Sequence, residues 1–158
     1  HMIKLKDILF ENSNKILVPR RLEKRKEDQK RITLQKIQQY IKNGSKGDLD
    51  LSNTPVTSLP DNLKVGGSLY LGNTQITSLP DNLKVGRSLN LYNTPITSLP
   101  DNLKVVGSLV LENTKITSLP DNLEVGGNLY LRNTPISKKY SKEEVKKMVP
   151  KVEGTIYI

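Results

Sequence analysis

The sequence predicts an α/β solenoid, in which short coils of chain stack on one another and their strands form a parallel sheet. A 20-residue unit occurs four times, and its copies begin at Asn53, Asn73, Asn93 and Asn113. Twelve of its twenty columns hold the same residue in all four copies. In each copy two leucines alternate with two other residues, the pattern of a strand with one buried face. A fixed period of this length indicates stacked units that share one continuous core.

One coil supplies more apolar side chains than it can bury alone. In the second coil they are Leu69, Leu71, Ile76, Leu79, Leu83 and Val85. Stacking buries them, because each side chain then lies on its equivalent in the next coil, with strands about 4.8 Å apart. Residues 79–83 (LPDNL) are expected to return in an extended, polyproline-like or short 3₁₀ conformation, because Pro80 restricts itself and the residue before it. Glycine pairs such as Gly66-Gly67 then predict a tight turn into the next strand.

The motif LxLxxTxIxxLPxxL, repeated from Leu49 to Ile136, resembles the leucine-rich repeat (LRR) family. It is similar to the short repeats of secreted bacterial effector LRR proteins and of uncharacterised bacteriophage LRR proteins. The resemblance implies a right-handed solenoid with the parallel β-sheet on its concave face and helical caps at both ends.

Two columns depart from the family pattern. The family's first leucine is replaced by Gly66, Gly86, Val106 and Gly126. The usual inward asparagine is replaced by Thr54, Thr74, Thr94, Thr114 and Thr134. A threonine hydroxyl can still hydrogen-bond the backbone where the chain leaves the strand, and the asparagines before these threonines suit a turn.

Charge divides the chain into three segments. Residues 1–46, predicted to be a basic helical cap, carry a net charge of +8; the repeats at 47–136 carry −2; residues 137–158, a capping helix and final strand, carry +3. These values sum to the net charge of +9. His1-Met2 has the form of a tag remnant followed by a start methionine.

The N-terminal segment predicts a short helix near residues 5–10, an interruption at Pro19 and a charged stretch at 20–31. A second helix follows, with Leu34, Ile37, Tyr40 and Ile41 on one face, and it ends at Gly44. This face is expected to cover the open end of the first coil.

The C-terminal segment predicts a different cap. Ser141 and Glu144 form a capping-box pattern at the start of a helix over 142–149, which Pro150 stops. Ile156 then restores the strand pattern 27 residues after Leu129, which predicts an enlarged last coil and a sixth strand.

Composition argues against an enzyme. The chain has no cysteine, its one histidine is His1, and its glycine pairs do not precede helices as in a phosphate-binding loop. We therefore predict no catalytic residue and no cofactor. No apolar run has the length of a signal peptide or membrane span, so the expected location is the cytoplasm of a bacterial or phage-infected cell, without a membrane partner.

A column of aspartates raises the question of calcium. It consists of Asp61, Asp81, Asp101 and Asp121. The parallel lysines Lys64, Lys84 and Lys104 offset the repulsion, and Asp-Asn after proline is ordinary turn chemistry. We predict no metal site.

The columns that vary between the repeats predict a protein-binding surface on the concave face. Its candidate residues are Asp50, Tyr70, Asn90, Tyr92, Val110, Glu112, Tyr130, Arg132 and Tyr157. Outward positions also vary where packing does not constrain them, and tyrosine also favours strands. However, Ser78, Asp81 and Asn82 are expected to be exposed and do not vary between repeats, and tyrosine is enriched at interfaces. The partner would be a protein that the sequence does not identify.

Two other functions compete with this prediction. Nucleic acid could bind the N-terminal cations Arg20, Arg21, Lys24, Arg25, Lys30 and Arg31. The acidic residues Glu23, Glu27 and Asp28 among them favour a merely solvated helix instead. The phage resemblance also leaves open a structural or assembly component of a phage. The sequence does not indicate the oligomeric state.

Overall fold

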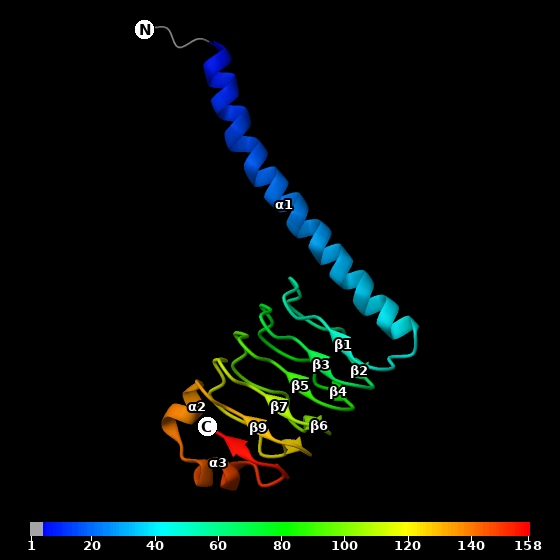
Figure 1. Ribbon diagram of the computed structural model, residues 1–158, viewed down its shortest axis with the longest axis vertical. Helices are drawn as coiled ribbons and strands as arrows, with labels where there is room; N and C mark the ends of the chain where they lie inside the picture. The colour runs from blue at the N-terminus through cyan, green and yellow to red at the C-terminus, as the bar shows by residue number, and fades with distance from the viewer. Residues whose placement is uncertain (1–4) are drawn as a thin grey trace.

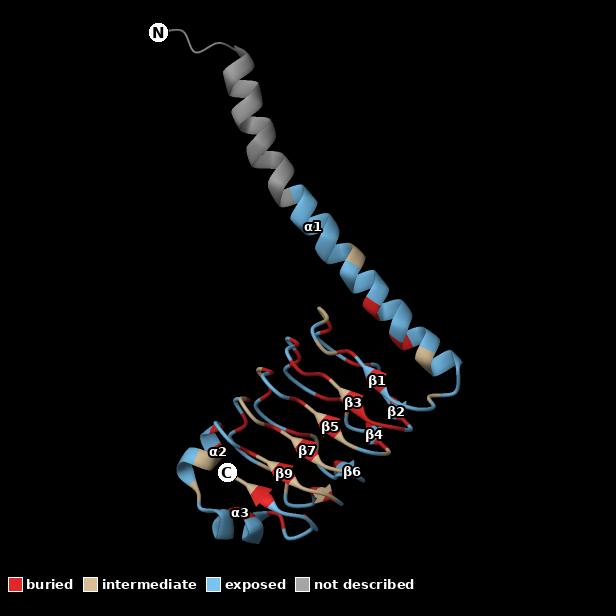
Figure 2. Cartoon of the chain, viewed as in Figure 1, coloured by how far each residue is buried: buried red, intermediate tan, exposed pale blue. Residues whose placement is uncertain are grey.

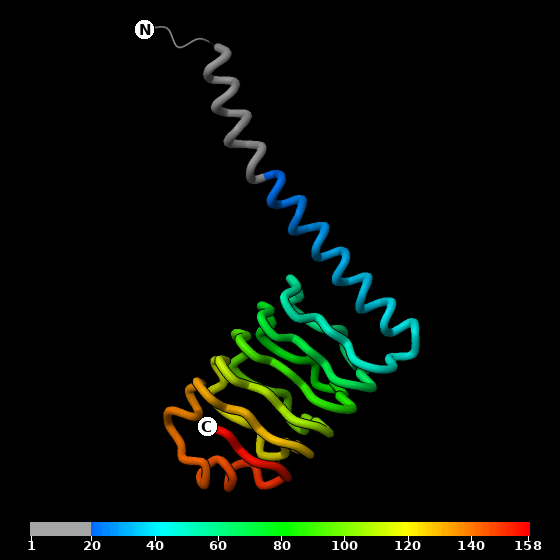
Figure 3. The backbone as a smooth tube through the Cα atoms, in the orientation of Figure 1, coloured from blue at the N-terminus to red at the C-terminus, as the bar shows by residue number. Residues whose placement is uncertain are grey.

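The computed structural model describes the backbone of residues 5–158 and the side chains of residues 20–158. Figure 1 shows a stack of coils with a long helix projecting from its N-terminal end and two short helices at its C-terminal end. The same path is drawn as a tube in Figure 3. The tag remnant predicted at His1-Met2 lies outside the described residues.

The coils form the predicted parallel sheet. Its strands are, in spatial order, β1 (Leu49–Asp50), β3 (Leu69–Tyr70), β5 (Leu89–Asn90), β7 (Leu109–Val110), β9 (Leu129–Tyr130) and β10 (Ile156–Tyr157). Neighbouring strands pair residues 20 apart, such as Leu49 with Leu69. The last pair is Leu129 with Ile156, at the predicted offset of 27. The expected LRR solenoid with six parallel strands is therefore confirmed.

A second parallel sheet runs along the other side of the coils. Its strands are β2 (Lys64–Val65), β4 (Lys84–Val85), β6 (Lys104–Val105) and β8 (Glu124–Val125). In each strand the valine is buried. The sequence analysis expected only a turn before the next coil here, because two residues are too few to show an alternating pattern. The sheet exists because identical coils stack, which places these short segments in register.

The core runs through the whole stack between the two sheets, as the buried segments of Figure 2 show. All six apolar side chains of the second coil are buried, and Leu69, Leu71 and Ile76 are fully enclosed. The first strand is protected as well, since Leu49 and Leu51 are 2% and 0% exposed.

The threonine column replaces the inward asparagine as expected. Each hydroxyl donates to the carbonyl of the leucine three residues earlier, at 2.6 to 2.8 Å, from Thr54, Thr74, Thr94, Thr114 and Thr134. These leucine carbonyls lie inside the solenoid, where an unpaired acceptor costs about 1–3 kcal/mol. The preceding asparagines have φ of +52° to +57°, a left-handed conformation that asparagine tolerates better than most residues.

One continuous helix, α1 (Leu5–Lys42), replaces the two separate helices that the sequence predicted. The interruption expected at Pro19 was wrong, since the helical backbone continues through it. The predicted end was correct: Gly44 adopts φ of +85°, and Ser45 N–H donates to the Tyr40 carbonyl at 3.0 Å.

Only the last turns of α1 cap the solenoid. Ile37 and Thr33 are buried, and Tyr40 packs against the core. The Tyr40 hydroxyl lies 2.9 and 2.8 Å from the carbonyl oxygens of Ser45 and Gly47 and accepts from Gly66 N–H at 3.1 Å. The predicted capping face was therefore wrong in part, because Leu34 and Ile41 are exposed.

The C-terminal cap has one helix more than predicted. The short helix α2 (Pro135–Lys139) begins at Thr134, which forms a complete capping box with Ser137. The next helix, α3 (Lys142–Met148), begins where expected, with Ser141 accepting from Glu144 N–H at 3.2 Å. No reciprocal bond from the Glu144 side chain occurs in this described helix, so only half of that predicted box forms. Val145, Val149 and Val152 are buried and close the core.

Candidate functional site

The outward side chains of the six-stranded sheet lie side by side on the concave face. Strand pairing aligns one column, formed by Asp50, Tyr70, Asn90, Val110, Tyr130 and Tyr157. A second column, two residues further along each coil, contains Tyr92, Glu112 and Arg132. The structure therefore brings all nine predicted partner-binding residues onto one surface, which we call the concave face throughout.

The C-terminal end of the concave face is held in a fixed arrangement. The rings of Tyr130 and Tyr157 stack with centroids 4.8 Å apart and planes 8° from parallel. The Arg132 guanidinium carbon lies 5.5 Å from the Tyr157 ring centroid, within range of a cation–π interaction. Asn128 Nδ2 donates to the Tyr130 hydroxyl at 3.2 Å. Because these side chains already contact one another, little rotamer entropy is lost when a partner binds them.

The middle of the concave face is varied in chemistry. Tyr92 is 39% exposed, and Tyr70, Val110 and Glu112 are half-buried. Aromatic, aliphatic and charged groups thus alternate along neighbouring strands. This mixture suits a protein surface better than a uniform ligand such as a polyanion.

Two of the predicted binding residues also have a local structural role. Asp50 Oδ1 accepts from Ser52 N–H at 2.9 Å, and Asn90 Oδ1 accepts from Tyr92 N–H at 2.9 Å. Each bond fixes the backbone where the chain leaves its strand. The sequence analysis did not assign this role, although Asp and Asn commonly form such turns.

The hydrogen bond at Asp50 predicts a pH effect on stability. Bonding to Ser52, with a smaller contribution from the positive charge of Lys36, holds the pKa of the Asp50 carboxyl below its ordinary value. The folded state therefore binds this proton less tightly than the unfolded state, so Asp50 stabilises the fold above its unfolded pKa. That contribution is lost as the pH falls through the folded pKa.

We expect urea denaturation of Asp50→Asn to show a shallower loss of unfolding free energy between about pH 5 and pH 2 than the native chain. The asparagine keeps an acceptor for Ser52 N–H but does not titrate. Identical pH profiles for the two proteins would contradict a stabilising role for the ionised carboxylate.

The predicted nucleic-acid-binding cations are all exposed on α1. They do not form one stripe, because successive helical residues are separated by about 100°. Arg20, Lys24 and Arg31 share a face, whereas Lys30 lies on another. Two of the six are in ion pairs, Lys30 with Glu27 at 3.5 Å and Arg31 with Asp28 at 2.9 Å.

The residues described in the structure contain no group of three or more His, Cys, Asp or Glu side chains placed to hold a metal ion. The aspartate column instead borders turns, and Leu83 and Leu103 N–H groups donate to Pro80 and Pro100 carbonyls there at 3.2 and 3.3 Å. No helix in the described part of the chain combines the length and apolar character needed to cross a membrane.

Comparison with known proteins gives one related structure to report. No protein-family model matches the chain, and no curated protein matches it. Among solved structures, the chain is similar to an LRR protein of Leptospira interrogans, with 31% sequence identity and a TM-score of 0.44. The match covers 67% of this chain but 30% of the Leptospira protein. The chain thus spans less than a third of that protein's length.

Proposed function

We propose that the chain is a non-enzymatic binding scaffold that recognises a protein through its concave face. The observation that carries this proposal is the contrast between columns. The back turns keep the same exposed residues in every repeat, whereas the concave face differs from coil to coil. Ser78, Asp81 and Asn82 are exposed yet identical in all four units, so exposure alone does not account for the variation.

Chemistry at the C-terminal end of the concave face supports the proposal. Tyrosine and arginine are the residue types enriched where interfaces carry most of their binding energy. Tyr130, Tyr157 and Arg132 form one stacked group there. A partner that packs against this group would bury apolar ring surface and gain hydrogen bonds at the hydroxyl and guanidinium groups.

The test is a pull-down from cell lysate at moderate salt with nuclease added. The binding variant changes Tyr70, Tyr92, Tyr130 and Arg132 to alanine. The matched control changes Ser58, Ser78 and Ser98 to alanine, three exposed positions on the back turns. Circular dichroism should show that all three proteins are folded.

We expect a protein captured by the native chain and the serine control but lost, by about tenfold or more, with the quadruple variant. Equal capture by all three proteins would contradict binding at the concave face. If nucleic acid is recovered when nuclease is omitted, and is released between low and moderate salt, the competing proposal of binding through α1 is favoured instead.

A further inference from the structure

The rim that joins the second sheet to the next strand of the first is built from glycine. Gly66-Gly67 and Gly126-Gly127 occupy it in two coils, and the backbones approach closely there. A Cβ added to Gly86 would lie 2.2 Å from the Gly66 carbonyl oxygen. The same addition to Gly126 would lie 2.2 Å from the carbonyl oxygen of residue 106. Glycine in this column is thus a steric requirement of the stacked coils.

Val106 occupies this column, and the ladder is distorted where it does so. Its N–H lies 3.5 Å from the Val85 carbonyl oxygen, whereas the equivalent bonds from Gly86 and Gly126 are 2.8 and 2.9 Å. One rung earlier, residues 84 and 124 donate to the preceding coil at 3.1 and 3.0 Å. The described backbone hydrogen bonds include no such bond from Lys104. The valine therefore opens the second sheet locally.

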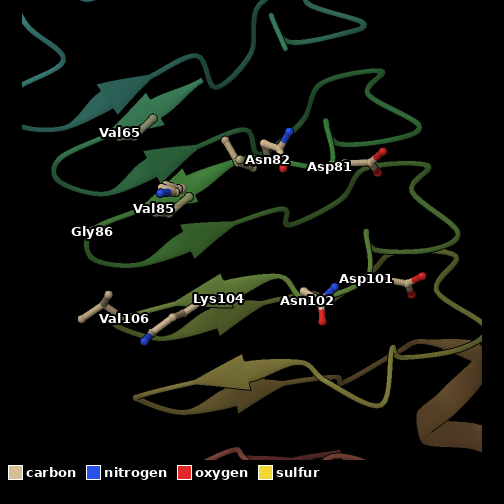
Figure 4. Close-up of a pocket in the computed structure, with 11 residues that line it drawn as sticks. Val65, Asp81, Asn82, Val85, Gly86, Asp101, Asn102, Lys104 and Val106 are labelled. Atoms are coloured by element: carbon tan, nitrogen blue, oxygen red, sulfur yellow. The ribbon is translucent and has the colours of Figure 1, made fainter. Parts of the chain in front are cut away.

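The side chain gains nothing inside the fold from this distortion. Val106 is 57% exposed, more than any other large apolar side chain of the repeats. It forms a ridge between two grooves. One, of about 730 Å³, lies against residues 81–86 and 101–104 and is shown in Figure 4. The other is bounded by Glu124, Pro150 and Lys151. An exposed apolar ridge that costs the fold hydrogen bonds points to a contact outside the chain.

A second departure from glycine stands beside the first. Arg87 takes the column otherwise held by Gly67, Gly107 and Gly127. Its carbonyl accepts from Gly107 N–H at 2.9 Å, which places it next to Val106 on the neighbouring coil. Arg87 is exposed and forms no ion pair with the described residues.

The surroundings of these two side chains are mainly cationic. Lys84 and Lys104 point outward from the same sheet, and Figure 4 shows Lys104 beside Val106 while Asp81 and Asp101 lie at the far end of the groove. The one carboxylate close to Lys104, that of Glu124, is already shared between Lys104 at 3.5 Å and Lys151 at 3.6 Å. The charge therefore favours an acidic partner.

We propose that Arg87 and Val106 form a second docking site, the rim site, which binds an acidic protein segment. An apolar side chain of that segment packs on Val106, and a flanking carboxylate pairs with Arg87 and the adjacent lysines. The rim site lies apart from the concave face and does not depend on its proposed function.

The test uses the two variants that restore the repeat's own residue, Arg87→Gly and Val106→Gly. Neither should unfold the chain, since the other coils hold glycine at these positions. The probe is a synthetic peptide, Glu-Glu-Leu-Glu-Glu, titrated while the Val106 methyl and Arg87 side-chain resonances are followed by NMR. Lys-Lys-Leu-Lys-Lys and Glu-Glu-Ser-Glu-Glu serve as control peptides.

We expect saturable shifts centred on Val106 with the acidic apolar peptide, and affinity lowered about fivefold or more by each glycine variant. The midpoint of urea denaturation should not fall in Val106→Gly. The quadruple alanine variant of the concave face should bind this peptide as the native chain does. The proposal is overturned if the shifts do not saturate, if the variants bind equally well, if the basic peptide binds as tightly, or if Val106→Gly is less stable.

Discussion

Replacing Leu91 by alanine should lower the free energy of unfolding by about 3–5 kcal/mol, the upper part of the range for a fully buried leucine. Leu91 is 0% exposed and lies in the middle of the stack. Its removal leaves a cavity between coils that have no other source of core. Because each coil is stabilised by its neighbours, the adjacent coils should lose stability with it.

Urea denaturation followed by circular dichroism measures this loss. Leu34→Ala is the matched control, because the same atoms are removed from a side chain that is 53% exposed on α1. The control should change stability by less than about 0.5 kcal/mol. A loss below about 1 kcal/mol for Leu91→Ala would mean that the core is not shared between coils in the way the structure shows.

Gly86→Ala should be the second most damaging single change, costing about 2 kcal/mol or more. The added methyl group would lie 2.2 Å from the Gly66 carbonyl oxygen, which belongs to backbone and cannot rotate away. The coils must then separate locally, as they do at Val106, and the bond from residue 86 to the Val65 carbonyl lengthens or breaks.

Gly72→Ala provides the same chemical change without the clash. A Cβ at Gly72 would meet its nearest heavy atom, the Tyr92 carbonyl oxygen, at 3.5 Å, an ordinary contact. This variant should be neutral or slightly stabilising, since alanine restricts the unfolded chain. Comparable losses of unfolding free energy in both variants would show that backbone flexibility, and not close approach of the coils, explains the glycine column.

The sequence by itself determined the stacking and its register. Because the unit repeats at a constant 20 residues, Leu49 can face only Leu69 if every coil is to bury its leucines. The same requirement predicted that Ile156 pairs with Leu129 across a longer connection. The core could be predicted for the same reason, as could the placement of Tyr70, Tyr130 and their equivalents on one surface.

Only the tertiary structure decided features that depend on distances between coils or on the angle of a helix against the stack. The face of α1 that caps the solenoid contains Ile37 and Tyr40, whereas Leu34 and Ile41 from the same predicted stripe are exposed. Periodicity shows that a helix has an apolar side, but the direction from which it meets the first coil selects the buried part of that side.

The rim follows the same logic. In the sequence, Val106 and Arg87 are two differences among nearly identical repeats, and nothing marks them as more consequential than the others. The close approach of neighbouring backbones explains why glycine is needed in their columns. Because hydrogen bonding between stacked coils fixes that approach, the cost of Val106 is visible only in the lengths of bonds between residues about 20 apart.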